Sequence, residues 1–250
     1  MKSLKSLLVL IIALGLTMAT LQAQKSGEIL YEETMKLDIQ TDDAPGGVDL
    51  TGMLPASRSV TKKLTFNENE SVYEDSGDGP EDTEFSSDDG SIEIKIMASD
   101  IESILYTNYD NEESLDQQGF MDRAFIISKP VTKLKWKITP EKVKYLDYEC
   151  MKATTTDEEG REIVAWFAPA IPVNAGPSGY GQLPGAILML SRDDQKLEIK
   201  ATRIELKEVD TIKKPNDGKK VTMEEYDKIV EEKMKEMEKE YGGRSLMIRG

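Results

Sequence analysis

The chain has 250 residues, with 32 Lys and Arg against 47 Asp and Glu, a formal net charge of −15, no histidine and one cysteine. The lack of histidine excludes a Ser-His-Asp triad, a Cys-His dyad and an HExxH zinc site. The single cysteine excludes an intrachain disulfide and a cysteine-cluster metal site. The acidic balance argues against nucleic acid and anionic lipid headgroups as partners, because both need a surplus of Lys and Arg. We expect no metal and no cofactor.

Residues 1–23 have the pattern of a signal peptide. Lys2 and Lys5 precede the apolar run Leu7–Leu16, and the following residues become small and polar up to Ala23. This pattern predicts cleavage before Gln24 and an exported protein, periplasmic or extracellular. The apolar run is too short for a membrane span, and no later segment approaches the ~18 apolar residues that a span requires. A short N-terminal anchor helix is the alternative.

Residues 24–212 show the alternation of apolar and polar residues that is typical of half-buried strands. The clearest hairpin has strands around Tyr148–Ala153 and Ile163–Phe167, and a second joins Ile187–Leu190 to Leu197–Ala201. Further strand patterns lie at 29–39, 60–66, 72–73, 92–96, 105–109, 125–127 and 134–138, followed by a predicted turn at 139–141. Cys150 lies within the first hairpin, where we expect a small buried side chain; a reactive or dimer-forming thiol is the alternative.

An acidic stretch interrupts this domain at residues 68–90. It carries ten acidic residues between Glu68 and Asp89 and no Lys or Arg. A Ca²⁺ site is conceivable there, but the spacing does not match an EF-hand loop. We expect a solvated, irregular loop insertion.

The C-terminal part changes to a helical period. After a linker at 213–222, Thr222 and Glu225 form a capping box, and apolar residues then recur every three or four positions. These residues are Tyr226, Ile229, Val230, Met234, Met237 and Tyr241. We predict an amphipathic helix at 223–241 and a tail at 242–250, with Gly242 as the stop signal. The predicted fold class is therefore α+β and mainly β: a strongly curved, half-barrel-like antiparallel sheet with one C-terminal helix.

The segment Ala165–Leu188 is the least generic part of the chain. Eight Gly and Pro residues between Pro169 and Gly185 exclude regular structure, yet apolar residues are interspersed among them. A flexible linker would be polar, so we expect an ordered loop that packs against one edge or end of the sheet. The candidate binding residues of this segment are Trp166, Phe167, Tyr180, Leu183, Pro184 and Gly185.

This segment resembles the signature of the GLPGLI family, which stands here as Gln182-Leu183-Pro184-Gly185-Ala186-Ile187-Leu188. Gln182 replaces the usual first glycine and Ala186 the usual leucine. Flanking positions also match, including Trp136, Cys150 and Trp166, and the likeness extends over about residues 27–206. The resemblance implies a protein exported by bacteria of the Bacteroidetes group, with an undefined biochemical role. It carries over no catalytic residue.

Three functions are consistent with these sequence features. The first is a non-enzymatic cell-envelope binding protein that holds a hydrophobic or lipid-like ligand in the concave sheet, with the loop and the helix as a gate. The second is an interaction module that docks on an outer-membrane or secretion protein. The third is a hydrolase without histidine, for which Ser59 and Lys62 provide an SxxK spacing but no partner motif. We favour binding over catalysis.

Overall fold

The computed structural model describes residues 25–36, 56–76, 83–86, 93–96, 102–157, 160–192 and 196–241. The predicted signal peptide at 1–23, the tail at 242–250 and residues 77–82 and 87–90 of the acidic stretch lie outside these ranges.

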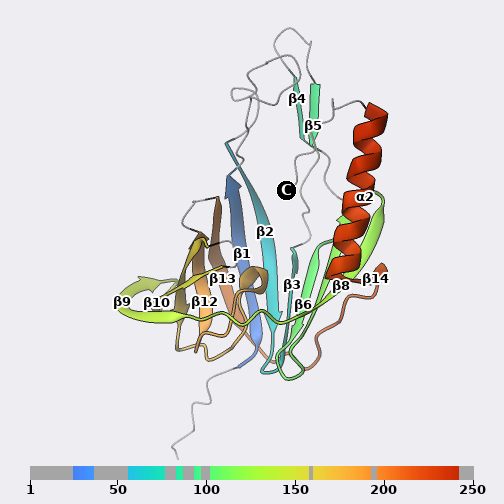
Figure 1. Ribbon diagram of the computed structural model, residues 1–250. Coiled ribbons are helices and arrows are strands. Elements are labelled where there is room, and N and C mark those ends of the chain that lie inside the picture. Colours follow the sequence, from blue (N-terminus) through green and yellow to red (C-terminus); the bar gives the residue numbers. More distant parts are fainter. Residues whose placement is uncertain are drawn as a thin grey trace, which may run out of the picture.

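Twelve strands form one open sheet in the order β14-β8-β7-β6-β3-β2-β1-β13-β12-β11-β10-β9 (Figure 1). Their bounds are β1 Gly27–Lys36, β2 Ser57–Phe66, β3 Glu70–Asp75, β6 Ile104–Asn108, β7 Glu113–Phe120, β8 Arg123–Pro130, β9 Lys137–Tyr145, β10 Tyr148–Thr156, β11 Glu162–Ala168, β12 Ala186–Arg192, β13 Leu197–Leu206 and β14 Lys219–Thr222. Two short strands, β4 (Thr83–Ser86) and β5 (Glu93–Ile96), pair separately.

The predicted fold class is confirmed: the sheet is curved and mainly antiparallel, with one C-terminal helix. The predicted hairpins are present as β10–β11 and β12–β13. β1 lies at the centre, where it pairs with β2 on one side and with β13 on the other. The alternating side chains of β1 therefore place Ile29 and Tyr31 in the centre of the core, both fully buried.

Two strands have no counterpart in the sequence prediction, and a third is longer than predicted. The short strand expected at 72–73 is present as β3, which extends over Glu70–Asp75 within the stretch predicted as an acidic loop, because Val72 and Tyr73 are buried between β2 and β6. Lys219–Thr222, predicted as linker, is β14, which runs parallel to β8 and buries Val221. β7 has no apolar alternation, and its buried side chains are mainly polar: Ser114, Asp116 and Gln117.

The predicted turn at 139–141 is instead a bulge within β9. Lys142 pairs with Met151 and Ile138 pairs with Ala153, so β9 has two extra residues between these pairs. Proline cannot donate a hydrogen bond to a neighbouring strand and occurs at edges and bulges. Pro140 meets both conditions, because β9 is the last strand of the sheet order.

The connection from β8 to β9 crosses the concave face from one end of the sheet to the other. β8 is second in the strand order and β9 is twelfth. Residues 131–136, here the crossing segment, pass in front of β1 and β2 (Figure 1). This segment and the β11–β12 loop, residues 169–185, define the candidate site.

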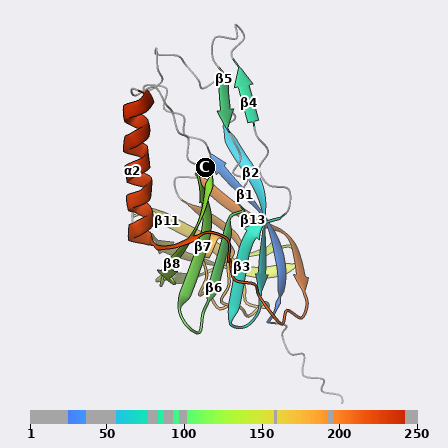
Figure 2. The same ribbon diagram turned by 90° about the vertical axis from the view of Figure 1, so that its right-hand side faces the viewer.

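Helix α2, Met223–Tyr241, matches its predicted bounds. The capping box is formed: the Thr222 amide donates to Glu225 Oε2 at 2.9 Å, and the Glu225 amide donates to Thr222 Oγ1 at 3.2 Å. Tyr226 packs against Phe125 and Val221, so the helix covers β8 and β14 at one end of the sheet. From the side, α2 rises beside β8 (Figure 2). Among the described residues, no helix is long and apolar enough to cross a membrane.

Candidate functional site

Glycines determine the path of the β11–β12 loop. A Cβ at Gly185 would lie 2.3 Å from the carbonyl oxygen of Ala168, and its φ of +156° is rare for other residues. A Cβ at Gly176 would lie 2.0 Å from the carbonyl oxygen of Tyr180. Both contacts are with main-chain atoms, which cannot move aside as a flexible side chain can. The glycines therefore let the loop fold closely onto itself and onto the end of β11.

The loop is ordered and packed, as its composition predicts. The amide of Ala186 donates to the carbonyl of Ile171 at 2.9 Å, and the amide of Gln182 donates to the carbonyl of Asn174 at 2.8 Å. Its apolar side chains Ile171, Val173, Ala175 and Leu183 join the main hydrophobic cluster, each no more than 6% exposed. The loop therefore fills the concavity of the sheet instead of covering an open hollow.

Two hydrogen bonds attach the crossing segment to this loop. The indole N–H of Trp136 donates to the carbonyl of Gly181 at 2.8 Å, and the side-chain amide of Gln182 donates to the carbonyl of Thr132 at 2.6 Å. Gln182 has a φ of +67°, a conformation that favours glycine. The usual glycine of the GLPGLI motif fits this backbone without strain, and the glutamine offsets its strain with the bond to Thr132.

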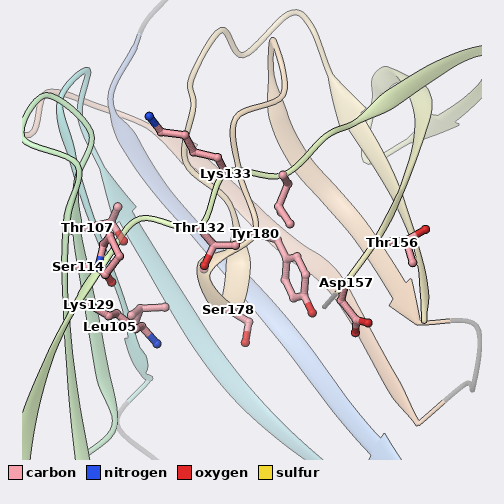
Figure 3. Close-up of a pocket in the computed structure, with 13 residues that line it drawn as sticks. Leu105, Thr107, Ser114, Lys129, Thr132, Lys133, Thr156, Asp157, Ser178 and Tyr180 are labelled. Carbon is pink, nitrogen blue, oxygen red and sulfur yellow. The ribbon is translucent and has the colours of Figure 1, made fainter. Parts of the chain in front are cut away.

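A cleft of about 310 Å³ remains between the crossing segment, the loop and the sheet. It is lined by Leu105 and Thr107 of β6, Ser114 of β7, Lys129 and Pro130 of β8, Thr132, Lys133 and Leu134 of the crossing segment, Thr156 and Asp157 at the end of β10, and Ser178, Gly179 and Tyr180 of the loop. In the close-up, Tyr180 lies between β6–β8 on one side and Asp157 on the other, with its hydroxyl toward Asp157 (Figure 3). We call this space the crossing cleft.

The crossing cleft combines hydroxyl groups with an apolar surface. Leu105, Pro130, Leu134 and the ring of Tyr180 provide the apolar part, and the remaining lining is mainly hydroxyl-bearing. Its charged groups have partners: Lys129 pairs with Asp116 at 2.9 Å, Lys133 with Glu112 at 2.7 Å, and Arg161 with Asp157 at 2.7 Å. Burial raises the pKa of Tyr180, and nearby Asp157 adds to this effect. The Tyr180 hydroxyl is therefore a neutral hydrogen-bonding group at physiological pH.

The six predicted binding residues separate into three environments. Tyr180 lines the crossing cleft. Phe167, Leu183 and Gly185 are buried in the core. Pro184 is exposed, and Trp166 is half-buried, with the Lys152 ammonium 6.0 Å from its ring centroid. The structure therefore brings only Tyr180 of the six into the cleft.

Sequence reasoning missed the other side of the crossing cleft. Thr107, Ser114 and Lys129 come from three strands, and β7 was not recognised because its alternation is polar. Strand register brings these residues together: Ser114 pairs with Thr107 across β6–β7 and with Lys129 across β7–β8. These three residues become neighbours only once all three strands are placed.

Two other candidates have unreactive surroundings. Ser59 Oγ lies 2.7 Å from Thr34 Oγ1 and Lys62 pairs with Asp75 at 2.6 Å, so Lys62 is not positioned as a base for Ser59. Cys150 is fully buried, and burial raises the pKa of its thiol to about 11. The small buried role expected for Cys150 fits this environment. Over the described ranges, no cluster of three or more Cys, Asp or Glu side chains could hold a metal ion.

Comparison with known proteins gives a family match within this region. The model of a Bacteroidetes-associated family, described as a protein of unknown function (Porph_ging), matches residues 156–189. That range contains β11, the whole β11–β12 loop and the start of β12. No curated protein matches the chain.

The solved structure of PNGF-II has a similar fold over part of its length. PNGF-II in crystals of space group P21 aligns with a TM-score of 0.51 at 17% sequence identity, over 82% of this chain and 33% of that chain. The C2 crystal form of PNGF-II aligns with a TM-score of 0.51 at 16% sequence identity, over 82% of this chain and 32% of that chain. An uncharacterized conserved protein from Thermus thermophilus aligns with a TM-score of only 0.39 at 6% sequence identity, over 80% of this chain and 91% of that chain. This chain thus spans about a third of the length of PNGF-II, and the likeness concerns the fold alone.

Proposed function

We propose that the chain is an exported, non-enzymatic binding protein of the cell envelope, a member of the GLPGLI family, and that the crossing cleft holds a small ligand with a hydrophobic part. The signal-peptide pattern at 1–23 supports export to the periplasm or the cell surface. The cleft is the observation that carries the proposal, because ordered groups from six different segments converge on it.

The size of the cleft limits the ligand. Binding sites for small molecules have volumes of about 300–1,000 Å³, and this cleft of about 310 Å³ lies at the lower end. The loop occupies the space in which a complete lipid chain would have to lie. A short acyl group or a small amphiphile fits better, with its apolar part against Leu105, Leu134 and Tyr180 and its polar part toward the hydroxyl groups.

Native mass spectrometry of the mature protein, purified from the periplasm of its own host, tests this proposal. We expect a retained small molecule. Leu134→Asp places a charge on the apolar side of the cleft and should abolish retention. Leu146→Asp is the matched control, because Leu146 is an exposed leucine at the β9–β10 turn, away from the cleft.

The two variants also separate ligand loss from unfolding. Both should keep the wild-type far-UV circular dichroism spectrum, and only Leu134→Asp should lose the added mass. A wild-type protein without added mass, or equal retention by both variants, would contradict the proposal.

The exposed β9 edge favours a second candidate function, a module that docks on an outer-membrane or secretion protein. Of the six large hydrophobic residues that are exposed in the described structure, Ile138, Val143 and Leu146 all belong to the β9–β10 hairpin. Exposed apolar residues that cluster in this way mark interaction surfaces.

A further inference from the structure

Strand β9 provides an open sheet edge. It pairs with β10 on one side and is the last strand of the sheet order, so its other side has no neighbouring strand among the described residues. Seven of its nine residues are exposed. The β9–β10 hairpin extends outward at the left of the molecule (Figure 1). The bulge at 139–141, which contains Pro140, interrupts this edge, so residues 142–145 are the regular part that can pair with an extended segment of another chain.

The charge of this edge is opposite to that of the chain. Residues 133–144, KLKWKITPEKVK, comprise the end of the crossing segment and most of β9. They contain one glutamate and five lysines, three of them on β9, whereas the whole chain has a net charge of −15. Lys142 pairs with Glu149 and Lys144 pairs with Asp147, but these pairs are more than half exposed and stabilise little. Their lysines can therefore exchange partners at low cost. We call residues 133–144 the basic edge.

Apolar groups lie among these lysines. Ile138 is 45% exposed and Val143 is 38% exposed. A basic surface alone would suit many anions, but exposed Ile and Val on a strand offer an extended peptide apolar contacts beside its main-chain hydrogen bonds.

We propose that the basic edge is a docking site for an acidic, extended segment of a partner protein, which adds to the sheet beside β9. Charge complementarity selects this occupant. A second copy that paired through its own β9 would bring Lys137, Lys142 and Lys144 close to the same lysines, and like charges across paired strands are destabilising. The inference is separate from the crossing cleft, since only Lys133 and Leu134 belong to both.

The probe for this site is a capped ten-residue peptide of alternating Glu and Val. We expect saturable binding by fluorescence anisotropy in 50 mM salt, together with slower amide exchange at residues 142–145 of β9. Raising the salt to about 1 M shortens the Debye length to about 3 Å and should abolish most of the binding. The triple change Lys137→Glu, Lys142→Glu and Lys144→Glu should weaken it at least about tenfold.

Three controls make the proposal falsifiable. The same peptide with N-methyl groups at alternate residues has the same charge but cannot pair as a strand, and equal binding of both peptides would contradict strand addition. A Lys-Val peptide should not bind. The triple change Lys228→Glu, Lys233→Glu and Lys235→Glu on helix α2 matches the charge change away from the site and should leave binding unchanged.

Two further outcomes would assign the surface to another occupant. A dimer in light scattering that the β9 triple variant abolishes would make a second copy the occupant. Preferential binding to vesicles of phosphatidylglycerol over the Glu-Val peptide would make it a membrane surface. Either result would overturn the proposal.

Discussion

The β11–β12 loop and the β9–β10 hairpin show opposite relations between regularity and burial. The loop has almost no regular structure, yet Ile171 and Leu183 are no more than 1% exposed. The hairpin is regular, yet Ile138 and Val143 at its edge are exposed. Glycines that permit close main-chain contact, rather than repeated hydrogen bonding, determine which segment enters the core here. The loop therefore belongs to the stable body of the protein, and the hairpin edge belongs to its interaction surface.

The largest effect is expected at Gly185. Gly185→Ala places a Cβ 2.3 Å from a main-chain oxygen, so the loop must leave its position, and we expect a loss of about 3 kcal/mol or more in the free energy of unfolding. Urea denaturation measures this loss. Gly160→Ala is the control: Gly160 has a φ of +83° but nothing within 4 Å of its Cβ position, so only the strain of about 1–2 kcal/mol remains. Equal losses would show that the loop does not pack as described.

Substitutions at two leucines compare the loop and the hairpin directly. Leu183 of the loop is 1% exposed, and Leu146 of the hairpin turn is 38% exposed. Leu183→Ala should cost about 2–5 kcal/mol, because it removes buried methyl groups and leaves a cavity. Leu146→Ala should cost less than about 0.5 kcal/mol. Thermal or urea unfolding gives both values, and a loss below about 1 kcal/mol for Leu183→Ala would place the loop outside the core.

Cys150 is the fully buried thiol of β10, in the β9–β10 hairpin. Burial raises its pKa to about 11 from an ordinary value of 9.0. The folded state then holds a proton that the unfolded state releases, so this contribution to stability is complete below about pH 9 and is lost as the pH rises to about 11. We expect stability to fall over that window, and Cys150→Ala to reduce the slope. An equal slope in both proteins would contradict the buried thiol.

The smallest effect is expected at Gln182. Gln182→Gly removes the left-handed strain together with the bond to Thr132, so we expect a net change within about 1 kcal/mol. Gln182→Ala keeps the strain and loses the bond, so it should be less stable than Gln182→Gly by about 1 kcal/mol. If Ala is as stable as Gly at this position, the left-handed backbone is not what favours glycine there.

The parts of the fold that could be predicted are those with a local signal. Alternation located the β10–β11 and β12–β13 hairpins, the capping box located α2, and apolar residues among the glycines predicted a packed loop. β7 was missed because its buried side chains are polar, and β14 because four residues are too short to show a period. Pro140 was assigned to a turn because an edge bulge and a turn have the same residue preferences.

The candidate site could be predicted only in part. Tyr180 was identified because it lies in the motif loop, but its neighbours Thr107, Ser114 and Lys129 depend on strand register. The gate expected of the helix is not formed at the crossing cleft: α2 covers β8 and β14, and none of the residues that line the cleft belongs to it. The five lysines of residues 133–144 are evident in the sequence, but only the strand order shows that β9 is the last strand and that its lysines lie at an open edge.

Native-state hydrogen exchange of the β11–β12 loop tests the central claim most directly. The amides of Ile171, Gln182 and Ala186 donate to main-chain carbonyls within the packed loop and at its ends. We predict that they exchange as slowly as the amides of central strand β1, through global unfolding. Rapid exchange of these three amides, while β1 remains protected, would show that the loop opens independently and would contradict its place in the core.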